Sequence, residues 1–307
     1  MGTPMSSTVW FITLAALVVV LAIDLALALK DRNKETSMRT ATLWTLFYIV
    51  LAIAFGISLG YWHDSQSRSE FFAGWLTEYS LSFDNLFIFI LILARLKVPK
   101  EKAQLVLLFG IVIALILRGI FIAAGSAIIE RWSWVFFIFG GFLLYTAIQL
   151  FRESSEEEWE ESKFIAYLRS KGASTFTLAL FALATTDLLF ALDSIPAIFG
   201  LTRDPYIVVT ANLFALMGLR QLYFLIGGLM NKLIYLTEGL SLILAFIGVK
   251  LVFEACHAQG WHKIFGVEIP HIPLALSLGF IVVTLAVTAS ISLLKTRKPH
   301  HHHPHSH

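Results

Sequence analysis

The chain is poor in cysteine and in charge. One of its 307 residues is cysteine, Cys256, so neither a disulfide framework nor a Cys-x-x-Cys metal site is available. Only 14% of the residues are charged, against roughly 25% in soluble domains. No Gly-Lys-Ser or Gly-Lys-Thr phosphate-binding loop occurs, so nucleotide hydrolysis is not expected. These absences argue against a large soluble domain, and we expect no organic cofactor and no nucleic-acid partner.

What the chain has instead is apolar sequence, with 57% hydrophobic residues and a mean hydropathy of +0.76. Runs of about 20 apolar residues recur from end to end, the length that crosses a bilayer as a helix. Polar and apolar residues do not alternate within these runs, as they would in the strands of a membrane β-barrel. We therefore predict an all-α, polytopic membrane helix bundle surrounded by lipid. Nine spans are expected, at about 8–29, 40–61, 72–95, 104–128, 132–151, 174–200, 206–229, 235–254 and 271–294.

Lys and Arg are concentrated in the loops that follow the odd-numbered spans, as at 30–39 and 95–102. The positive-inside rule makes these loops cytoplasmic. The N-terminus is then outside and the C-terminus inside. The first apolar run lacks a basic segment before it and is too long for a signal peptide, so we expect it to be retained as a helix.

The chain divides by composition into seven segments. The acidic loop is expected to be a solvated cytoplasmic loop or short helix, with a weak metal-sensing face as the alternative. The His-rich tail is either a transition-metal-binding segment or an addition to the natural chain. The segments are a first helix and loop (1–39), a peripheral helix and loop (40–71), repeat one (72–151), the acidic loop (152–173), repeat two (174–254), a loop and last helix (255–294), and a basic, then His-rich tail (295–307).

Repeat one and repeat two are defined by three weak matches in the same order. Each copy has three spans, and an odd number places the second copy upside down relative to the first. Inverted repeats are typical of secondary transporters whose ion sites lie near the membrane midplane. The alternative is that apolar helices resemble one another by composition. The matches pair 78–85 with 187–194, 117–121 with 219–223, and 143–150 with 244–251, at offsets of 109, 102 and 101 residues.

Polar residues inside these apolar runs are the candidate site, because an ionisable group in hydrocarbon is costly and is retained for function. We expect Asp84 and Asp193 to face each other near the axis that relates the copies. Pro196 either frees the Leu192 carbonyl as a further ligand or merely ends its helix. The predicted metal ligands are Glu78, Asp84, Asn85, Asp187, Asp193 and Ser194; the predicted supporting residues are Ser82, Thr186, Leu192, Arg118, Arg220 and Asn212.

Three further expectations concern the charged residues near these motifs. Arg118 and Arg220 either pair with the acids or extend to an interface. Asp24 is close enough to a span end to reach water. Lys250 and Glu254, four residues apart, are expected to form a local surface pair.

The candidate ligands are all oxygen atoms, which suit Mn²⁺, Ca²⁺ and Mg²⁺. No pair of Cys or His residues accompanies them, and this argues against Zn²⁺ or Cu⁺ as cargo. Buried carboxylates can also relay protons, so a proton path is a further interpretation.

Three of these stretches resemble motifs of the TerC family of bacterial integral membrane proteins. They are 80–85 (Ser-Leu-Ser-Phe-Asp-Asn), 184–197 around Asp187 and Asp193, and 212–220, and the resemblance extends over roughly 40–290. It is nearest to the Alx-type, manganese-exporting branch. The resemblance implies efflux of Mn²⁺ across the bacterial cytoplasmic (inner) membrane. The family name refers to tellurite, but four acids would repel an oxyanion.

The leading hypothesis is therefore a secondary exporter of divalent metal cations and not an enzyme, with Mn²⁺ before Ca²⁺ as the transported ion. A Ca²⁺/H⁺ or other cation exchanger is a close alternative. A membrane stress-response scaffold would leave the buried acids without a role. An intramembrane aspartyl hydrolase would use two of them as acid and base, but duplication of the whole acidic pair favours ion ligation. Transport direction, coupling ion and oligomeric state stay open.

Overall fold

The computed structural model describes residues 4–30, 37–153, 162–229 and 232–297, and at some helix positions, Asp84 and Asp193 among them, it describes the backbone alone. These residues form helices and one short hairpin, β1 (Lys263–Ile264) with β2 (Val267–Glu268). The helices are α1 Ser7–Lys30, α2 Met38–Trp62, α3 Ser65–Arg95, α4 Lys100–Arg131, α5 Val135–Glu153, α6 Lys163–Ser170, α7 Thr175–Phe199, α8 Pro205–Leu216, α9 Leu219–Leu229, α10 Leu236–Ala258 and α11 Leu274–Arg297.

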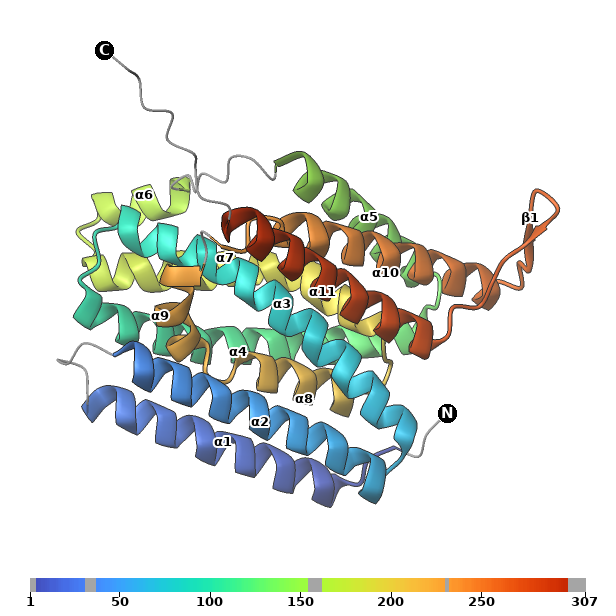
Figure 1. Ribbon diagram of the computed structural model, residues 1–307, viewed down its shortest axis with the longest axis horizontal. Coiled ribbons are helices and arrows are strands. Elements are labelled where there is room, and N and C mark those ends of the chain that lie inside the picture. Colours follow the sequence, from blue (N-terminus) through green and yellow to red (C-terminus); the bar gives the residue numbers. More distant parts are fainter. Residues whose placement is uncertain (1–3, 31–36, 154–161, 230–231, 298–307) are drawn as a thin grey trace, which may run out of the picture.

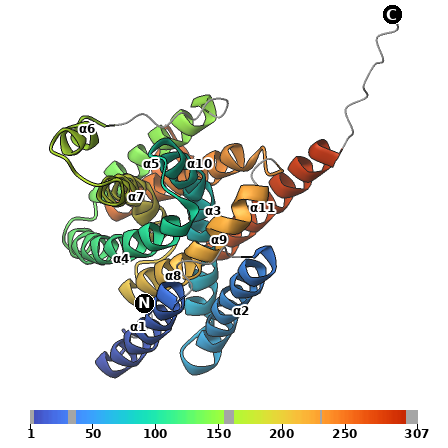
Figure 2. The same ribbon diagram turned by 90° about the vertical axis from the view of Figure 1, so that its left-hand side faces the viewer.

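The long helices form one bundle. α1 and α2 lie along one side, α5, α10 and α11 along the other, and α3, α4, α7 and α8 lie between them (Figures 1 and 2). α1 begins at one end of the bundle and α11 finishes at the other, and the hairpin projects from the end where α1 begins (Figure 1). The central helices are therefore covered by others on both sides.

Within the described part of the chain, six helices are long and apolar enough to cross a membrane: α1, α2, α4, α5, α10 and α11. The bent pair α8 and α9 makes a seventh if it is one span. A polytopic helical membrane protein is thereby confirmed. α3 and α7 cover the predicted spans 72–95 and 174–200 but are not among these six, so the count of nine stays a prediction.

The predicted span 206–229 is broken. α8 ends at Leu216 and α9 begins at Leu219, with a bend of 43° between them. Gly218, at φ +76°, has a conformation that L side chains rarely adopt, and a Cβ there would overlap the Tyr48 ring. A lone glycine in an apolar run is often tolerated within a helix, so the sequence alone did not predict this break.

Close backbone approaches join the helices in pairs. α5 and α10 run antiparallel: a Cβ on Gly140 would lie 2.8 Å from the Gly248 carbonyl oxygen, and Ser241 Oγ donates to the Ala147 carbonyl at 2.5 Å. Small residues permit this contact, as is usual between membrane helices. The long α5–α10 contact buries the middle of α10.

α4 and α7 run parallel, since Gly110 contacts Leu183 and Gly125 contacts Phe199 further along both helices. α3 meets α8 where a Cβ on Gly74 would lie 3.3 Å from that of Ala211. The four helices α3, α4, α7 and α8 are thus held together at the centre of the bundle, where the site lies.

Aspartates fix the start of two of these helices. Asp64 Oδ1 accepts a hydrogen bond from the Ser67 amide at 2.6 Å, which caps α3 and lowers the pKa of Asp64. Asp204 caps α8 through the Tyr206 amide at 3.0 Å, while burial raises the pKa of Asp204. Within the predicted acidic loop, α6 is a helix; residues 154–161 and the tail from 298 lie outside the described residues.

Candidate functional site

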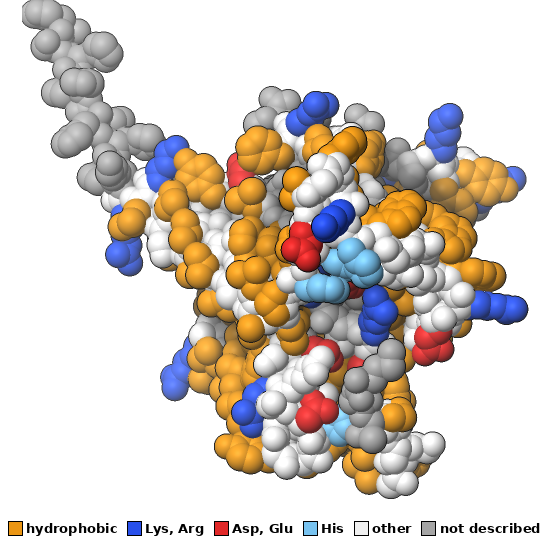
Figure 3. All heavy atoms as spheres, turned by 90° about the vertical axis from the view of Figure 1, so that its right-hand side faces the viewer, with side chains coloured by type: hydrophobic (Ala, Val, Ile, Leu, Met, Phe, Trp, Pro, Cys, Tyr) orange, Lys and Arg blue, Asp and Glu red, His pale blue; other side chains and the backbone are white. Residues whose placement is uncertain are grey.

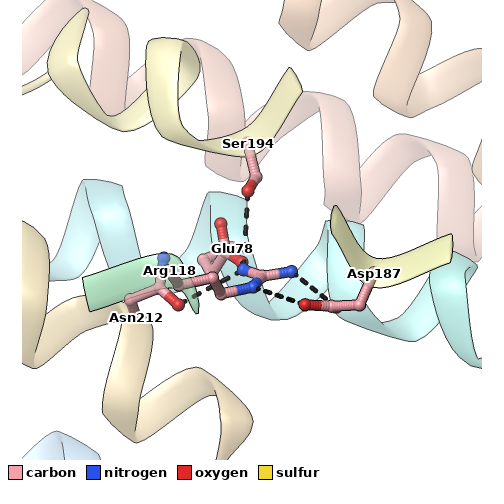
Figure 4. A network of polar contacts seen from close by, with 5 residues as sticks. All are labelled: Glu78, Arg118, Asp187, Ser194 and Asn212. Carbon is pink, nitrogen blue, oxygen red and sulfur yellow. Dashed lines mark hydrogen bonds and ion pairs between the residues drawn. The ribbon is translucent and has the colours of Figure 1, made fainter. Parts of the chain in front are cut away.

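The site is built around the guanidinium group of Arg118, on α4, which is 1% exposed. It contacts four oxygen-bearing side chains from three other helices (Figure 4). Arg118 Nε and Nη2 donate to the two carboxylate oxygens of Asp187 at 3.1 and 2.9 Å. Nη1 donates to Glu78 Oε1, to Asn212 Oδ1 at 3.2 Å and to Ser194 Oγ at 3.4 Å. The planar fork of arginine matches a carboxylate in this two-bond manner.

Helical periodicity explains how two elements supply most of these groups. Asp187 and Ser194 are seven residues apart on α7, about two turns, so they lie on one face. Glu78 and Ser82 are four apart on one face of α3. Asn212 comes from α8, which packs on α3. The site therefore depends on the contacts among α3, α4, α7 and α8.

Several buried polar atoms at the site have no hydrogen-bond partner within the described part of the chain. They are Glu78 Oε2, Ser82 Oγ, Thr77 Oγ1 and Asn212 Nδ2. A buried polar group left unpaired costs about 1–3 kcal/mol. Three of these four atoms are oxygens on α3, so the site has spare capacity to accept a donor or a cation.

The charges at the site do not cancel. Glu78 and Asp187 are two carboxylates against the single guanidinium of Arg118, so the three groups together carry one net negative charge if all are ionised. Among the described residues, no group of three or more His, Cys, Asp or Glu side chains surrounds one point as metal ligands would. Of the acids at the site, the structure describes the side chains of Glu78 and Asp187, and Arg118 lies between these two carboxylates.

The structure thus brings together five predicted residues: Glu78, Asp187, Ser194, Asn212 and Arg118. Ser82 lies one turn from Glu78 on α3. Asn85 and Thr186 are partly buried and take no part in the Arg118 contacts. The side chains of Asp84 and Asp193 lie outside the described residues, so the expectation that they face each other stays a prediction. α7 continues through Pro196, and the role of the Leu192 carbonyl is likewise still a prediction.

Arg220 does not pair with the described acids of the two motifs. Its Nη2 donates to Asp24 on α1 at 2.9 Å, and its Nη1 donates to Gln104 on α4 at 3.1 Å. The expectation that Asp24 reaches water is wrong, because α1 presents this residue to α9 and leaves it 5% exposed. Sequence reasoning missed this second ion pair, although a lone acid within an apolar run was a signal for it.

Lys250 and Glu254 are not a surface pair, because Lys250 is only 4% exposed. Glu254 instead pairs with Arg203, at 3.5 Å.

Apolar helices enclosing a network of buried charges define a multi-pass integral membrane protein. The chain belongs to the TerC family, since the sequence profile described as "Integral membrane protein TerC family" matches residues 63–300.

Similar proteins come from several bacteria. "Putative membrane-bound redox modulator Alx" of Escherichia coli (strain K12) is 32% identical, over 95% of this chain and 95% of its own length. A membrane protein of Myxococcus xanthus is 33% identical over 95% of this chain and 94% of its own length. One of Mycobacterium tuberculosis (strain H37Rv) is 40% identical over 82% of this chain and 70% of its own. No solved structure matches the chain.

Proposed function

We propose that this protein is a secondary transporter that exports a divalent cation, Mn²⁺ first and Ca²⁺ second, across the cytoplasmic membrane. One observation carries the proposal: Glu78, Asp187, Ser194 and Asn212 meet at a buried point between apolar helices (Figure 4). Buried charges within a membrane bundle mark ion pathways.

The chemistry of these groups favours a hard cation. Two carboxylates, a hydroxyl and an amide oxygen are the ligand types that Mn²⁺, Ca²⁺ and Mg²⁺ prefer. One oxygen of the Glu78 carboxylate, Oε2, is unpaired, and the unpaired Ser82 Oγ adds one more oxygen a turn away on α3. The resemblance to manganese exporters ranks Mn²⁺ ahead of Ca²⁺, because the oxygen set itself accepts either.

Arg118 has a defined part in this proposal. It occupies the carboxylates when cargo is absent, so that two buried negative charges are never left without a cation. The arriving ion displaces the guanidinium from Glu78 and Asp187, and Arg118 returns when the ion leaves. An unpaired buried charge would otherwise cost about 3–5 kcal/mol.

We further propose that α3–α5 and α7–α10 are inverted repeats. Support comes from two helix contacts, Gly110 with Leu183 and Gly74 with Ala211. Subtracting the offset of 109 from position 183 gives position 74, which is Gly74. Adding the offset of 102 to position 110 gives position 212, one residue after Ala211. The proposed repeat therefore relates one of these helix contacts to the other. The antiparallel α5–α10 pair is also what a two-fold axis through their crossing would produce. Such an arrangement suits alternating access to one central site.

Two other activities receive less support. An aspartyl hydrolase needs two carboxyl groups that share a proton, whereas Glu78 and Asp187 are held apart by Arg118. The name of the Escherichia coli relative suggests a redox role for that protein. Here the single cysteine, Cys256, is buried, so one chain has no thiol pair for disulfide exchange.

The test is Mn²⁺ flux into proteoliposomes. We expect Glu78→Gln, Asp187→Asn, Asp84→Asn and Asp193→Asn each to lower flux about ten- to a hundredfold, the usual effect of damaging a metal site. Glu268→Gln, on the exposed hairpin, is the matched control and should transport normally. Flux equal to that of empty liposomes for the unaltered protein would overturn the proposal. Overexpression should also lower the manganese content of cells, and an unchanged content would contradict export.

A further inference from the structure

The end of α10 and the segment that joins it to α11 carry three histidines that the proposed transport does not use. His257 is on the last turn of α10, His262 comes just before β1, and His271 comes just before α11. Histidine side chains gather at the middle of this end of the molecule, with acidic and basic side chains around them (Figure 3). By the predicted orientation this is the outer face of the membrane.

The three rings have a defined arrangement. Nδ1 of His257 lies 3.5 Å from Nδ1 of His262. Nε2 of His257 lies 3.4 Å from the Pro270 carbonyl oxygen, and the His271 ring stacks on that of His257 with centroids 3.7 Å apart. A carbonyl oxygen can only accept, so Nε2 of His257 bears the hydrogen and Nδ1 keeps its lone pair in the neutral ring.

We propose that His257 and His262 form a binding site for a borderline transition-metal ion of the Zn²⁺, Ni²⁺ and Cu²⁺ class. Two nitrogens at the usual Zn–N length in a tetrahedral shell are about 3.4 Å apart. The two Nδ1 atoms already have nearly this separation. Metal-bound histidines commonly donate their other ring N–H to a carbonyl, as His257 does to Pro270.

Backbone hydrogen bonds hold the two histidines in place without the metal. The Trp261 amide donates to the Cys256 carbonyl at 2.9 Å, and the Ile269 amide donates to the His262 carbonyl at 2.9 Å. The turn between the histidines and the hairpin after them are therefore fixed, and little chain ordering is needed on binding.

The site differs from the Arg118 site in both chemistry and place. Its ligands are imidazole nitrogens, which suit Zn²⁺, Ni²⁺ and Cu²⁺, while the buried site offers oxygens for hard cations. Because no third His, Cys, Asp or Glu of the described chain completes it, water fills the remaining positions and the ion exchanges readily. A bound ion would tie the end of α10 to the hairpin that leads into α11.

The test is the number of Zn²⁺ ions bound per chain, measured by equilibrium dialysis and elemental analysis of the full-length protein. We expect His257→Ala and His262→Ala each to lose one equivalent, and the double variant to lose the same one and no more. The His-rich tail is present in every variant, so its contribution cancels. His63→Ala, at the end of α2, is the matched control and should lose none.

Two outcomes would overturn the proposal. No loss in either single variant would show that the pair does not bind metal. A loss of two equivalents in the double variant would show two independent histidines and no shared site. Neither result depends on Mn²⁺ transport, so the histidine site and the proposed export function can fail separately.

Discussion

Arg118 and Arg220 lie at corresponding positions in the segments 117–121 and 219–223 that the proposed repeat pairs, yet they have different partners. Arg118 binds Glu78 and Asp187, whereas Arg220 binds Asp24 from α1. The sequence could single out both arginines, because charges in apolar runs are rare and costly. It could not assign the partner of Arg220, since this depends on how α1 packs against α9.

We predict that Arg118 is required for stability as well as transport. Arg118→Ala leaves two carboxylates buried without their cation and should lower the free energy of unfolding by about 3–5 kcal/mol. Arg118→Lys keeps the charge but loses the two-bond fork, so its loss should be intermediate. Unfolding of the two variants in detergent measures both losses of stability. Arg131→Ala, exposed at the end of the same helix, should behave like the unaltered protein. An equally stable Arg118→Ala variant would contradict the role given to this ion pair.

At the scale of helices, the bounds of the long apolar elements followed well from runs of about 20 residues. Two features of the helices did not follow from the sequence. The break between α8 and α9 depends on the contact of Gly218 with Tyr48, which lies far away in sequence. The burial of Lys250, which is 4% exposed, depends on how α10 packs among the other helices, and the sequence of α10 alone does not reveal this.

Neighbouring glycines on α5 allow a matched test of its contact with α10. A Cβ at Gly140 would lie 2.8 Å from the Gly248 carbonyl oxygen, whereas one at Gly141 would meet nothing within 4 Å. Gly140→Ala should therefore destabilise the protein by about 1–3 kcal/mol through overpacking. Gly141→Ala should be neutral or slightly stabilising, because alanine favours helix. Thermal unfolding of the two variants under the same conditions makes the comparison, and equal stabilities would argue against this helix crossing.

Gly218 allows a similar test of the broken helix. Gly218→Ala should destabilise the protein, because φ +76° is strained for alanine and the added methyl overlaps Tyr48. Gly119→Ala on α4, where nothing lies within 4 Å, serves as the control. If the Gly218 variant gained stability in thermal unfolding, the two segments would form one continuous helix in solution.

At the scale of the whole molecule, the positive-inside rule predicts which end of the bundle faces outward. Phe265, at the tip of the hairpin, is fully exposed and predicted to be outside. Lys171, just after α6, is exposed and predicted to be cytoplasmic. Cys256 is buried and gives little background labelling.

We expect Phe265→Cys to react with a membrane-impermeant maleimide in intact cells from which any outer membrane has been removed. Lys171→Cys should react only after the membrane is permeabilised. The two variants control for each other, and the reverse pattern would mean that the bundle is inserted in the opposite direction.

The tethered guanidinium of Arg118 also sets a threshold for the proposed cargo. The guanidinium is part of the chain and competes with the ion for the same carboxylates. The apparent affinity for the ion is therefore reduced in proportion to the fraction of time that the carboxylates are free of Arg118. Such a carrier would leave trace metal in the cell and discharge only a surplus. A low apparent affinity would then be a property that protects the cell's supply of an essential ion.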